Sequence, residues 1–176
     1  MRAIAFYKAF FFDFTNRESI NCSFKKINLH MDVYSKKIEV RWSDLDPNYH
    51  VRHSVYYDWP AYVRLAFFNE HGLTPEMSFQ LHIGPILFRE ECIFKREIKL
   101  GDTVESNLRL LKCRRDISRW SLMHEIWKNG DTLCAIVNVD GAWIDTNLRK
   151  LTVPPAIVQQ VFGAMTKTEN FEWQEG

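Results

Sequence analysis

Several features that would indicate other classes of protein are missing from this chain of 176 residues. Lysine and arginine (23) nearly balance aspartate and glutamate (22), and a net charge of +1 argues against a nucleic-acid-binding surface, which needs a concentrated basic excess. No apolar stretch is long enough to span a membrane. Lys8 and Asp13 interrupt the apolar N-terminal run, so no signal peptide is expected. We therefore expect a cytoplasmic protein with neither a nucleic-acid partner nor a membrane span.

Cysteine is scarce and widely spaced. The four residues, Cys22, Cys92, Cys113 and Cys134, form no Cys-x-x-Cys pair, so neither a zinc site nor a redox motif is indicated. We interpret them as small apolar core residues in a reducing compartment. The chain is 46% hydrophobic and 14% aromatic, which is typical of one globular domain that buries a core without disulfides.

Residues 39–59 have the pattern of a strand, a turn and the start of a helix. Apolar and charged residues alternate up to Trp42, which predicts a half-buried strand. The residues that follow are ones that cap or bend a backbone, and Pro47 fixes its own φ. Apolar residues at three- and four-residue spacing from Trp59 predict a helix that ends at Gly72.

The turn carries three polar side chains at alternate positions, Asp46, Asn48 and His50. A carboxylate, an amide and an imidazole can supply a base or nucleophile, an orienting group and a proton carrier. Between a strand and a helix, they can converge on a cleft. The alternative is that Asp46 and Asn48 only cap the turn while His50 packs against its neighbours, because such turns are common.

The same segment resembles a known family. Residues 41–51 read Arg-Trp-Ser-Asp-Leu-Asp-Pro-Asn-Tyr-His-Val, which is similar to the Arg-Trp-Ser-Asp-Leu-Asp-x-Asn-x-His-Val-Asn-Asn segment of hotdog-fold thioesterases, especially acyl-ACP thioesterases and their bacterial acyl-CoA relatives. Residues 94–102 resemble the aromatic, basic, basic, Glu and Gly-Asp pattern at the end of the family's second strand. The resemblance covers residues 34–162, and Arg52 and His53 depart from it, where the family has two asparagines.

The resemblance implies a fold and an activity. The fold is the α+β hotdog fold, an antiparallel sheet of five to six strands wrapped around one long central helix. The activity is hydrolysis of an acyl-CoA or acyl-ACP thioester without a metal or other cofactor, since CoA or ACP is part of the substrate. The sites are expected at the interface of a homodimer, which in this family sometimes pairs into a homotetramer.

The resemblance also implies roles for individual residues. Asp46 would be the essential carboxylate, as nucleophile or as base for water, while Asn48 would orient it or the substrate and His50 would assist proton transfer. Glu97 matches a glutamate proposed to act in plant-type acyl-ACP thioesterases. It lies on the polar phase of its strand, so a solvated surface carboxylate is the alternative.

Backbone amides near the start of the central helix would polarise the thioester carbonyl, because the N-terminal end of a helix dipole is positive. We expect these amides near Val55 to Trp59, although Pro60 leaves the helix start open. The candidates for contact with the acyl group are Val55, Tyr56, Tyr57 and Trp59. Aromatic residues at a helix start more often belong to the core, which is the alternative here.

Other functions are less well supported by the sequence. His50 and His53 form a His-x-x-His pair, but no further ligands follow at a plausible spacing, so no metal site is predicted. A serine hydrolase elbow, Gly-x-Ser-x-Gly, is absent, as is a dehydratase pattern. Lys112, Arg114 and Arg115 could hold coenzyme A phosphates or form a solvated turn. A hotdog domain that binds acyl thioesters without cleaving them, or a scaffold, is the second functional class.

We expect a single hotdog domain over residues 34–164. Before it, residues 1–33 form an N-terminal extension of uncertain structure, interpreted as residues that precede a true start at Met31, or alternatively as an aromatic run that packs on the domain or on a partner. Residues 165–176 look like a frayed C-terminal tail, with docking of its aromatic side chains as the alternative.

The remaining elements follow from alternation and turn residues. Strands are expected at residues 86–100, 104–113, 120–126 and 132–144, and a short helix is expected from Pro155 to Phe162. Asn129-Gly130 predicts a two-residue hairpin. Glu90 and Arg96 fall in the apolar phase of the first of these strands, which indicates a bulge or a pairing of these charges.

Overall fold

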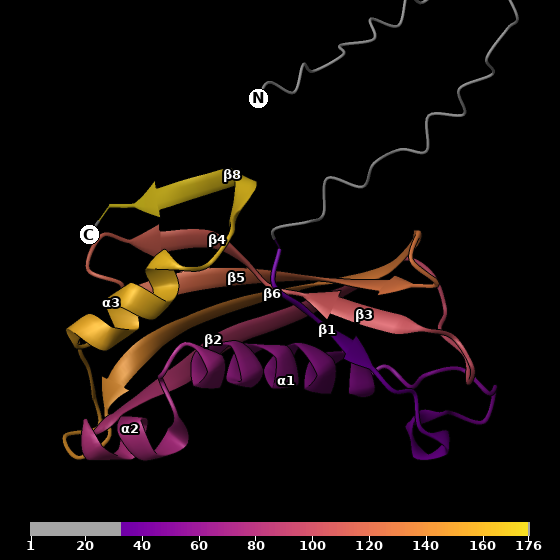
Figure 1. Cartoon of the computed structure of the whole chain (residues 1–176), viewed down its shortest axis with the longest axis horizontal. Coiled ribbons are helices and arrows are strands. Elements are labelled where there is room, and N and C mark those ends of the chain that lie inside the picture. The colour runs from indigo at the N-terminus through magenta and orange to yellow at the C-terminus, as the bar shows by residue number, and fades with distance from the viewer. Residues whose placement is uncertain (1–32, 176) are drawn as a thin grey trace, which may run out of the picture.

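A long helix, α1 (Val55–Glu70), lies across one face of a curled sheet in the computed structural model, which describes residues 33–175 (Figure 1). Side chains four residues apart on this helix, Val55, Trp59, Val63 and Phe67, are all buried against the sheet. The helix begins four residues before Trp59. The predicted N-terminal extension and Cys22 lie outside the described residues, except for the last residue of the extension.

The helix ends as predicted. Its C-cap is His71, and Gly72 follows with φ +89°, a left-handed conformation that glycine adopts without steric cost. Pro60 lies inside the helix; because it has no N–H, the carbonyl of Tyr56 receives no bond from that position.

The sheet is antiparallel except for one pair of strands. Its strands are β1 (Ser35–Ile38), β2 (Ile83–Phe94), β3 (Val104–Asn107), β4 (Arg109–Arg114), β5 (Arg119–Lys128), β6 (Thr132–Asp145), β7 (Lys150–Leu151) and β8 (Lys167–Gln174). β3 and β4 both pair with the same side of β5, one after the other along its length. β6 pairs with the other side of β5, and β2 pairs with β6. The α+β hotdog fold is therefore confirmed, with more strands than the five to six expected because the predicted strand 104–113 breaks at Leu108 and two strands, β7 and β8, are added.

The strand predicted to run to Trp42 is too long. β1 ends at Ile38, and a 3-10 helix, η1 (Trp42–Asp44), leaves the Trp42 side chain 78% exposed. The cause is the Asp44 carboxylate, which accepts a bond from the backbone N–H of Arg41 at 2.9 Å and turns the chain before Trp42 can pair.

The long strand predicted over residues 86–100 ends early. Both backbone N–H groups of Lys95 and Arg96 donate to the carbonyl of Cys134, at 2.8 and 3.0 Å, so the regular ladder stops at Phe94. The apolar phase is also interrupted earlier by a register shift between Leu87 and Arg89, the predicted bulge.

Two segments outside the predicted helices and strands are ordered. Between the helix predicted to end at Gly72 and the strand predicted from residue 86 lies a short helix, α2 (Pro75–Gln80), because Pro75 suits a first helical turn and the Thr74 hydroxyl accepts a bond from the N–H of Met77 at 3.2 Å. The predicted frayed tail is wrong: its residues form β8, which pairs in parallel with β4.

The end of the molecule near α3 (Ala156–Gly163) is packed with aromatic rings. Phe162 of this helix lies 5.9 to 6.1 Å, between ring centroids, from Trp120, Trp143 and Phe68. The helix predicted from Pro155 is confirmed, with Pro155 as its N-cap. Among the described helices, none is long and apolar enough to cross a membrane.

Candidate active site

The bend between β1 and α1 is organised by the Asp46 side chain. One carboxylate oxygen, Oδ1, accepts bonds from the backbone N–H groups of Asn48 at 2.8 Å and His50 at 3.1 Å. The Asp46 N–H donates to the His50 carbonyl at 2.8 Å. Asp46 thus caps its own turn, as the alternative proposed. The second oxygen, Oδ2, accepts no hydrogen bond from any described residue, so one side of the carboxylate is left for another partner.

Asp44, two residues earlier, has a different environment. Its carboxylate is buried and accepts two bonds from the Arg41 guanidinium, at 3.1 and 3.3 Å, while its carbonyl accepts from Arg52 N–H at 2.9 Å. Burial works to raise the pKa of Asp44, but the hydrogen bonds from Arg41 outweigh it and the pKa lies below its ordinary value. Both oxygens of Asp44 are occupied, so this residue holds the bend in shape.

The bend is joined to the segment after β2, which brings His50 to Glu97. Val51 N–H donates to the Ile98 carbonyl at 2.8 Å, and His50 forms an isolated bridge with Lys99. Glu97 Oε1 lies 3.6 Å from His50 Nε2 and 2.9 Å from Lys99 Nζ. The hydrogen bond from Lys99, with the nearby charge of His50, holds the pKa of the exposed Glu97 carboxyl below its ordinary value.

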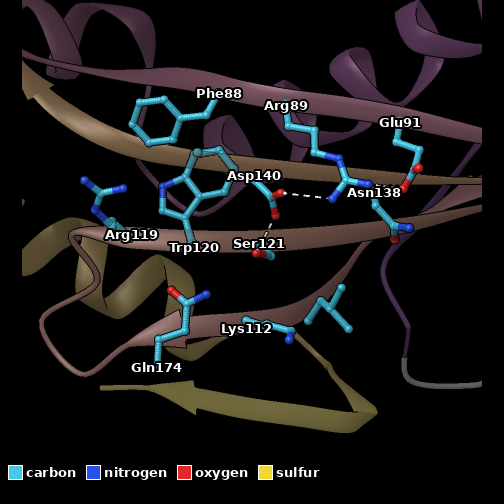
Figure 2. A pocket seen from close by; sticks show the side chains of 12 residues that line it. Phe88, Arg89, Glu91, Lys112, Arg119, Trp120, Ser121, Asn138, Asp140 and Gln174 are labelled. Atoms are coloured by element: carbon cyan, nitrogen blue, oxygen red, sulfur yellow. Dashed lines mark hydrogen bonds and ion pairs between the residues drawn. The ribbon is translucent and has the colours of Figure 1, made fainter. Parts of the chain in front are cut away.

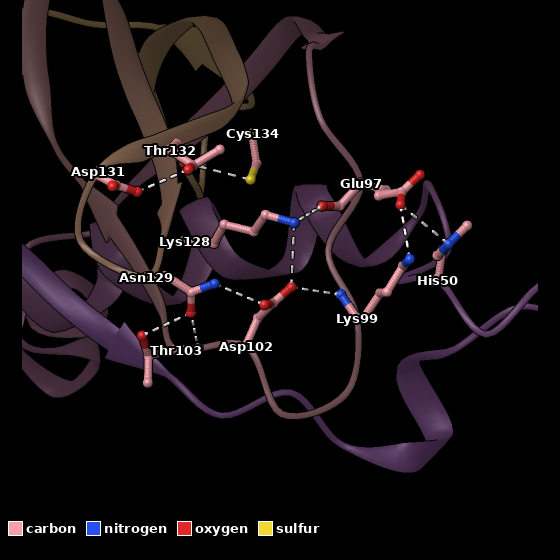
Figure 3. Close-up of polar contacts among 10 residues, drawn as sticks. All are labelled: His50, Glu97, Lys99, Asp102, Thr103, Lys128, Asn129, Asp131, Thr132 and Cys134. Atoms are coloured by element: carbon pink, nitrogen blue, oxygen red, sulfur yellow. Dashed lines mark hydrogen bonds and ion pairs between the residues drawn. The ribbon is translucent and has the colours of Figure 1, made fainter.

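Asp102 fixes the loop that carries Glu97 (Figure 3). Its carboxylate accepts bonds from the backbone N–H of Lys99 at 2.9 Å and the Asn129 side chain at 2.9 Å, and it lies 3.5 Å from Lys128 Nζ. Lys128 also donates to the Glu97 carbonyl at 2.7 Å. Neither side chain was predicted to contribute to the site.

An open groove of about 430 Å³ runs over this region. It is lined by Asp46, His50, Val51, His53, Tyr56, Phe94, Lys95, Arg96 and Glu97. Three of the four predicted catalytic residues therefore meet at one groove. Asn48 does not line it, and Asn48 reaches Asp46 through its backbone N–H rather than its side-chain amide.

The predicted acyl-contact residues divide between groove and core. Val55 and Trp59 are buried in the core, and Tyr57 is partly buried. Tyr56 lines the groove, and its ring contacts the Phe94 ring with centroids 5.1 Å apart. Burial raises the pKa of Tyr56 to about 12, so the phenol is protonated.

The first turn of α1 offers one backbone donor. The N–H groups of Val55 and Tyr57 are used by the carbonyls of Arg52 and Ser54, at 3.1 and 3.2 Å. The N–H of Tyr56, by contrast, has no acceptor in the part of the chain that the structure describes. It lies at the positive end of the helix dipole, next to the groove.

Within residues 33–175, no group of three or more His, Cys, Asp and Glu side chains is arranged to hold a metal ion. His50 and His53 both line the groove.

A second hollow, of about 340 Å³, lies over β2, β4, β5 and β6 (Figure 2). Its Arg89 lies 2.7 Å from Glu91 and 3.9 Å from Asp140, and Asp140 also accepts a bond from the Ser121 hydroxyl at 2.6 Å. Arg119 lies over the ring of Phe88. These charges are already paired, so the hollow has the character of a solvated polar face.

The basic residues considered for coenzyme A phosphates are also engaged. Lys112 lies in β4 and pairs with Glu172 of β8 at 3.0 Å. Arg114 and Arg115 line a hollow with Trp173, and the Arg115 guanidinium lies 4.7 Å from that ring. They lie near the C-terminal end of β8, at the opposite end of the molecule from the bend (Figure 1).

Two interior polar groups were missed. Arg64 of α1 is buried, and both of its terminal nitrogens lie 3.2 Å from Glu90 Oε1. His124 of β5 is fully buried, and its Nδ1 lies 2.6 Å from the Asn107 carbonyl. Burial, with a contribution from Arg64, lowers the pKa of His124 to about 3. The apolar phase of Glu90 was the signal for a buried partner, but it could not identify Arg64.

Comparisons with known proteins identify the family of the chain. Residues 40–162 match the family described as the thioesterase-like superfamily. No curated protein matches the chain.

Solved structures match at low sequence identity. A hypothetical protein from Staphylococcus aureus in complex with CoA is 19% identical, with TM-score 0.69 over 77% of this chain and 87% of that one. A 1,4-dihydroxy-2-naphthoyl-CoA thioesterase from Synechocystis is 16% identical, with TM-score 0.67 over 74% and 96%. A thioesterase from Thermus thermophilus, complexed with coenzyme A and Zn, is 24% identical, with TM-score 0.63 over 76% and 92%. At these identities the likeness establishes the fold.

Proposed function

The chain belongs to the thioesterase-like superfamily, and on that premise we propose that it hydrolyses an acyl-CoA or acyl-ACP thioester to a free acid and a thiol, with Asp46 as the essential carboxylate. The main support is the half-occupied carboxylate of Asp46. Its Oδ1 is held by two backbone N–H groups, while Oδ2 has no bond to a described residue and Asp46 lines a groove. Such a group is oriented and still available for chemistry.

In the proposed reaction the thioester carbonyl lies in the groove. Asp46 either removes a proton from water, whose oxygen then bonds to the carbonyl carbon, or attacks that carbon itself. In the second case loss of the thiolate leaves an anhydride between Asp46 and the acyl group, and a water molecule then hydrolyses it to the free acid and the free carboxylate. The N–H of Tyr56 stabilises the oxyanion, because it has no other described acceptor and lies at the helix N-terminus. When the C–S bond breaks, the thiolate takes a proton from His50, whose Nε2 lies 3.6 Å from Glu97 Oε1.

We further propose that the active form is a homodimer joined through β2, with a tetramer as a pair of such dimers. Within residues 33–175, β2 pairs on one side only, with β6, and it exposes Leu87, Phe88, Ile93 and Phe94. An exposed apolar edge strand is a template for pairing with another chain. Phe94 also lines the groove, so a partner on β2 would help to enclose the substrate.

The second candidate is a domain that binds acyl thioesters without cleaving them. It is favoured by one observation, that the Asp46 carboxylate already has the structural task of capping its turn. Asn at this position would retain an oxygen acceptor for both N–H groups and lose only the charge, so Asp46→Asn separates the two functions.

The test is release of free thiol from a panel of aliphatic, aromatic and ACP-linked thioesters. For Asp46→Asn we expect a loss of about 10²–10⁴-fold in kcat, the usual contribution of a catalytic acid or base, with the oligomer intact by size-exclusion chromatography. The matched control is Asp145→Asn, because Asp145 caps a remote turn in the same way, accepting from Asn147 and Leu148 N–H at 2.8 Å.

Full activity in Asp46→Asn would remove Asp46 from the reaction. Binding without turnover by the unmodified protein would favour the second candidate. Because the proposed reaction uses no cofactor, prior treatment with a chelator is expected to leave the rate unchanged.

A further inference from the structure

Helix α1 and strand β2 run side by side in opposite directions, and they are joined at two points (Figure 1). At the first, the rings of Tyr56 and Phe94 are in contact. At the second, Arg64 bonds to Glu90. Eight helical residues advance about 12 Å and four strand residues about 13 Å, so the two points are equally far apart on both elements. We call the strip between them the α1/β2 seam.

The first end of the seam opens into the candidate active site, since Tyr56 and Phe94 line the same groove as Asp46 and His50. Between the two ends, the periodicity of helix and strand directs Pro60 and Cys92 toward the seam. Both side chains are small, and Cys92 is only partly buried. The seam therefore begins at the reacting groups and continues over compact apolar side chains.

The other end of the seam is closed by charge. The side chains of Arg64 and Glu90 are only 9% and 23% exposed, and both terminal nitrogens of Arg64 lie 3.2 Å from one oxygen of Glu90. Separating such a pair would leave a buried charge uncompensated, which makes the pair a rigid stop. The methyl end of an acyl chain could neither hydrogen-bond to these groups nor replace their contacts.

We propose that the Arg64–Glu90 pair is the floor of the acyl-binding slot and limits the substrate to thioesters of short and medium-length acyl groups. The inference rests on the proposed function, because that function puts the thioester carbonyl at Asp46 and directs the acyl group into the seam. Arg64 and Glu90 are then specificity-determining residues with no part in the chemical step.

The test replaces both charges at once with flexible apolar side chains, as Arg64→Met/Glu90→Met, which leaves no unpaired partner. Rates are measured with butyryl-, octanoyl-, dodecanoyl- and hexadecanoyl-CoA. The unmodified protein should favour the two shorter thioesters. The double variant should raise the kcat/KM ratio of dodecanoyl- to butyryl-CoA by about tenfold or more, as a pocket that gains apolar length does, with kcat for butyryl-CoA unchanged.

The matched control is Lys36→Met/Glu70→Met. It removes an ion pair of 2.6 Å that also joins a strand to α1 but lies beyond the seam, at the C-terminal end of the helix. The chain-length preference of this control should equal that of the unmodified protein. Two results would overturn the inference. One is a preference of the unmodified protein for hexadecanoyl-CoA. The other is an unchanged kcat/KM ratio of dodecanoyl- to butyryl-CoA in a folded Arg64→Met/Glu90→Met variant.

A binding measurement separates this inference from the proposed function. Thioether analogues of the same acyl-CoA series cannot be hydrolysed, and their dissociation constants follow from calorimetry with the full chain. One outcome is that no thioester is cleaved, but affinity for the dodecanoyl analogue is lower than for the octanoyl analogue and recovers in Arg64→Met/Glu90→Met. In that case the proposed hydrolysis is wrong and the proposed closed slot is right. Affinity that is independent of chain length contradicts the closed slot, whatever the enzyme does.

Discussion

The two ends of α1 are held in different ways. At the C-terminal end, Phe67 and Phe68 are buried, and Phe68 packs near the rings of Trp143 and Phe162. At the N-terminal end, Tyr56 contacts Phe94, which remains 51% exposed. The helix residues are buried at both ends, but the ring that covers the N-terminal end is itself half exposed, whereas the rings at the C-terminal end are enclosed.

This difference teaches how one helix can serve both stability and chemistry. Tight aromatic packing at the far end fixes the helix axis, so the near end can tolerate an open groove and a turn whose carboxylate is only half engaged. The near end is instead positioned by polar contacts, from Asp44, Asp102 and Lys99. Substitutions at the two ends should therefore affect different quantities.

The largest effect is expected at the packed end. Phe162→Ala should lower the free energy of unfolding by about 3–5 kcal/mol, because it leaves a cavity among three rings. Urea unfolding measures this, and the rate per folded molecule should stay normal. Phe94→Ala at the open end should lower the free energy of unfolding much less than Phe162→Ala does, and it should lower the enzymatic rate more. Equal losses of stability in the two variants would remove the contrast between the ends.

The next effect concerns His124 of β5, which is fully buried and feels the charge of Arg64 of α1. Its folded pKa of about 3 is below the ordinary value of 6.5, so between these values the unfolded chain binds a proton that the folded protein does not. Stability must then fall as the pH drops below 6.5, by about 1.4 kcal/mol per pH unit at the steepest.

His124→Gln should flatten that pH dependence by about 2 kcal/mol between pH 6.5 and pH 5, measured by urea unfolding at each pH. Stability at pH 7.5 serves as the reference, since His124 is neutral in both states there. An unchanged slope would mean that His124 is protonated in the folded protein.

The smallest effect is expected from the loop that supports Glu97. Asp102→Asn keeps an oxygen acceptor for Lys99 but loses the acceptor for the Asn129 amide and weakens the contact with Lys128. We expect a loss of about 1 kcal/mol and so a fall of severalfold in kcat/KM. Asp131→Asn is the matched control in the neighbouring hairpin, where Asp131 accepts only from Thr132 at 2.8 Å. If both variants behave alike, the loop network does not position the site.

Local sequence patterns predicted much of the fold and of the bend. The Asn129-Gly130 hairpin, the strands around it and the end of α1 follow from interactions between near neighbours, which a short pattern records. The meeting of Asp46, His50 and Glu97 could be anticipated only through the resemblance, because the bridge between residues 50 and 99 is a long-range contact.

What could not be predicted depends on partners distant in the chain. Nothing within residues 165–176 indicates that β4 offers a free edge, so β8 looked like a tail. Arg64 falls on an apolar helix face, and only the position of Glu90, twenty-six residues later, accounts for its burial. Trp42 was wrongly predicted to end a half-buried strand. The apolar alternation continues to Trp42, but the bond from Arg41 N–H to Asp44 bends the chain before it.

The two edges of the sheet differ in a way that affects how copies of the chain can associate. On one edge lie β1, with four residues and two lysines, and β8, with five charged or amide side chains among its eight residues. On the other lies β2, twelve residues long and partly apolar. Among the described strands, only β2 is suited to pairing with a second chain. A symmetric contact between the β2 edges of two copies leaves neither edge free for a third copy. Pairing through β2 should therefore join two copies and should not propagate into filaments.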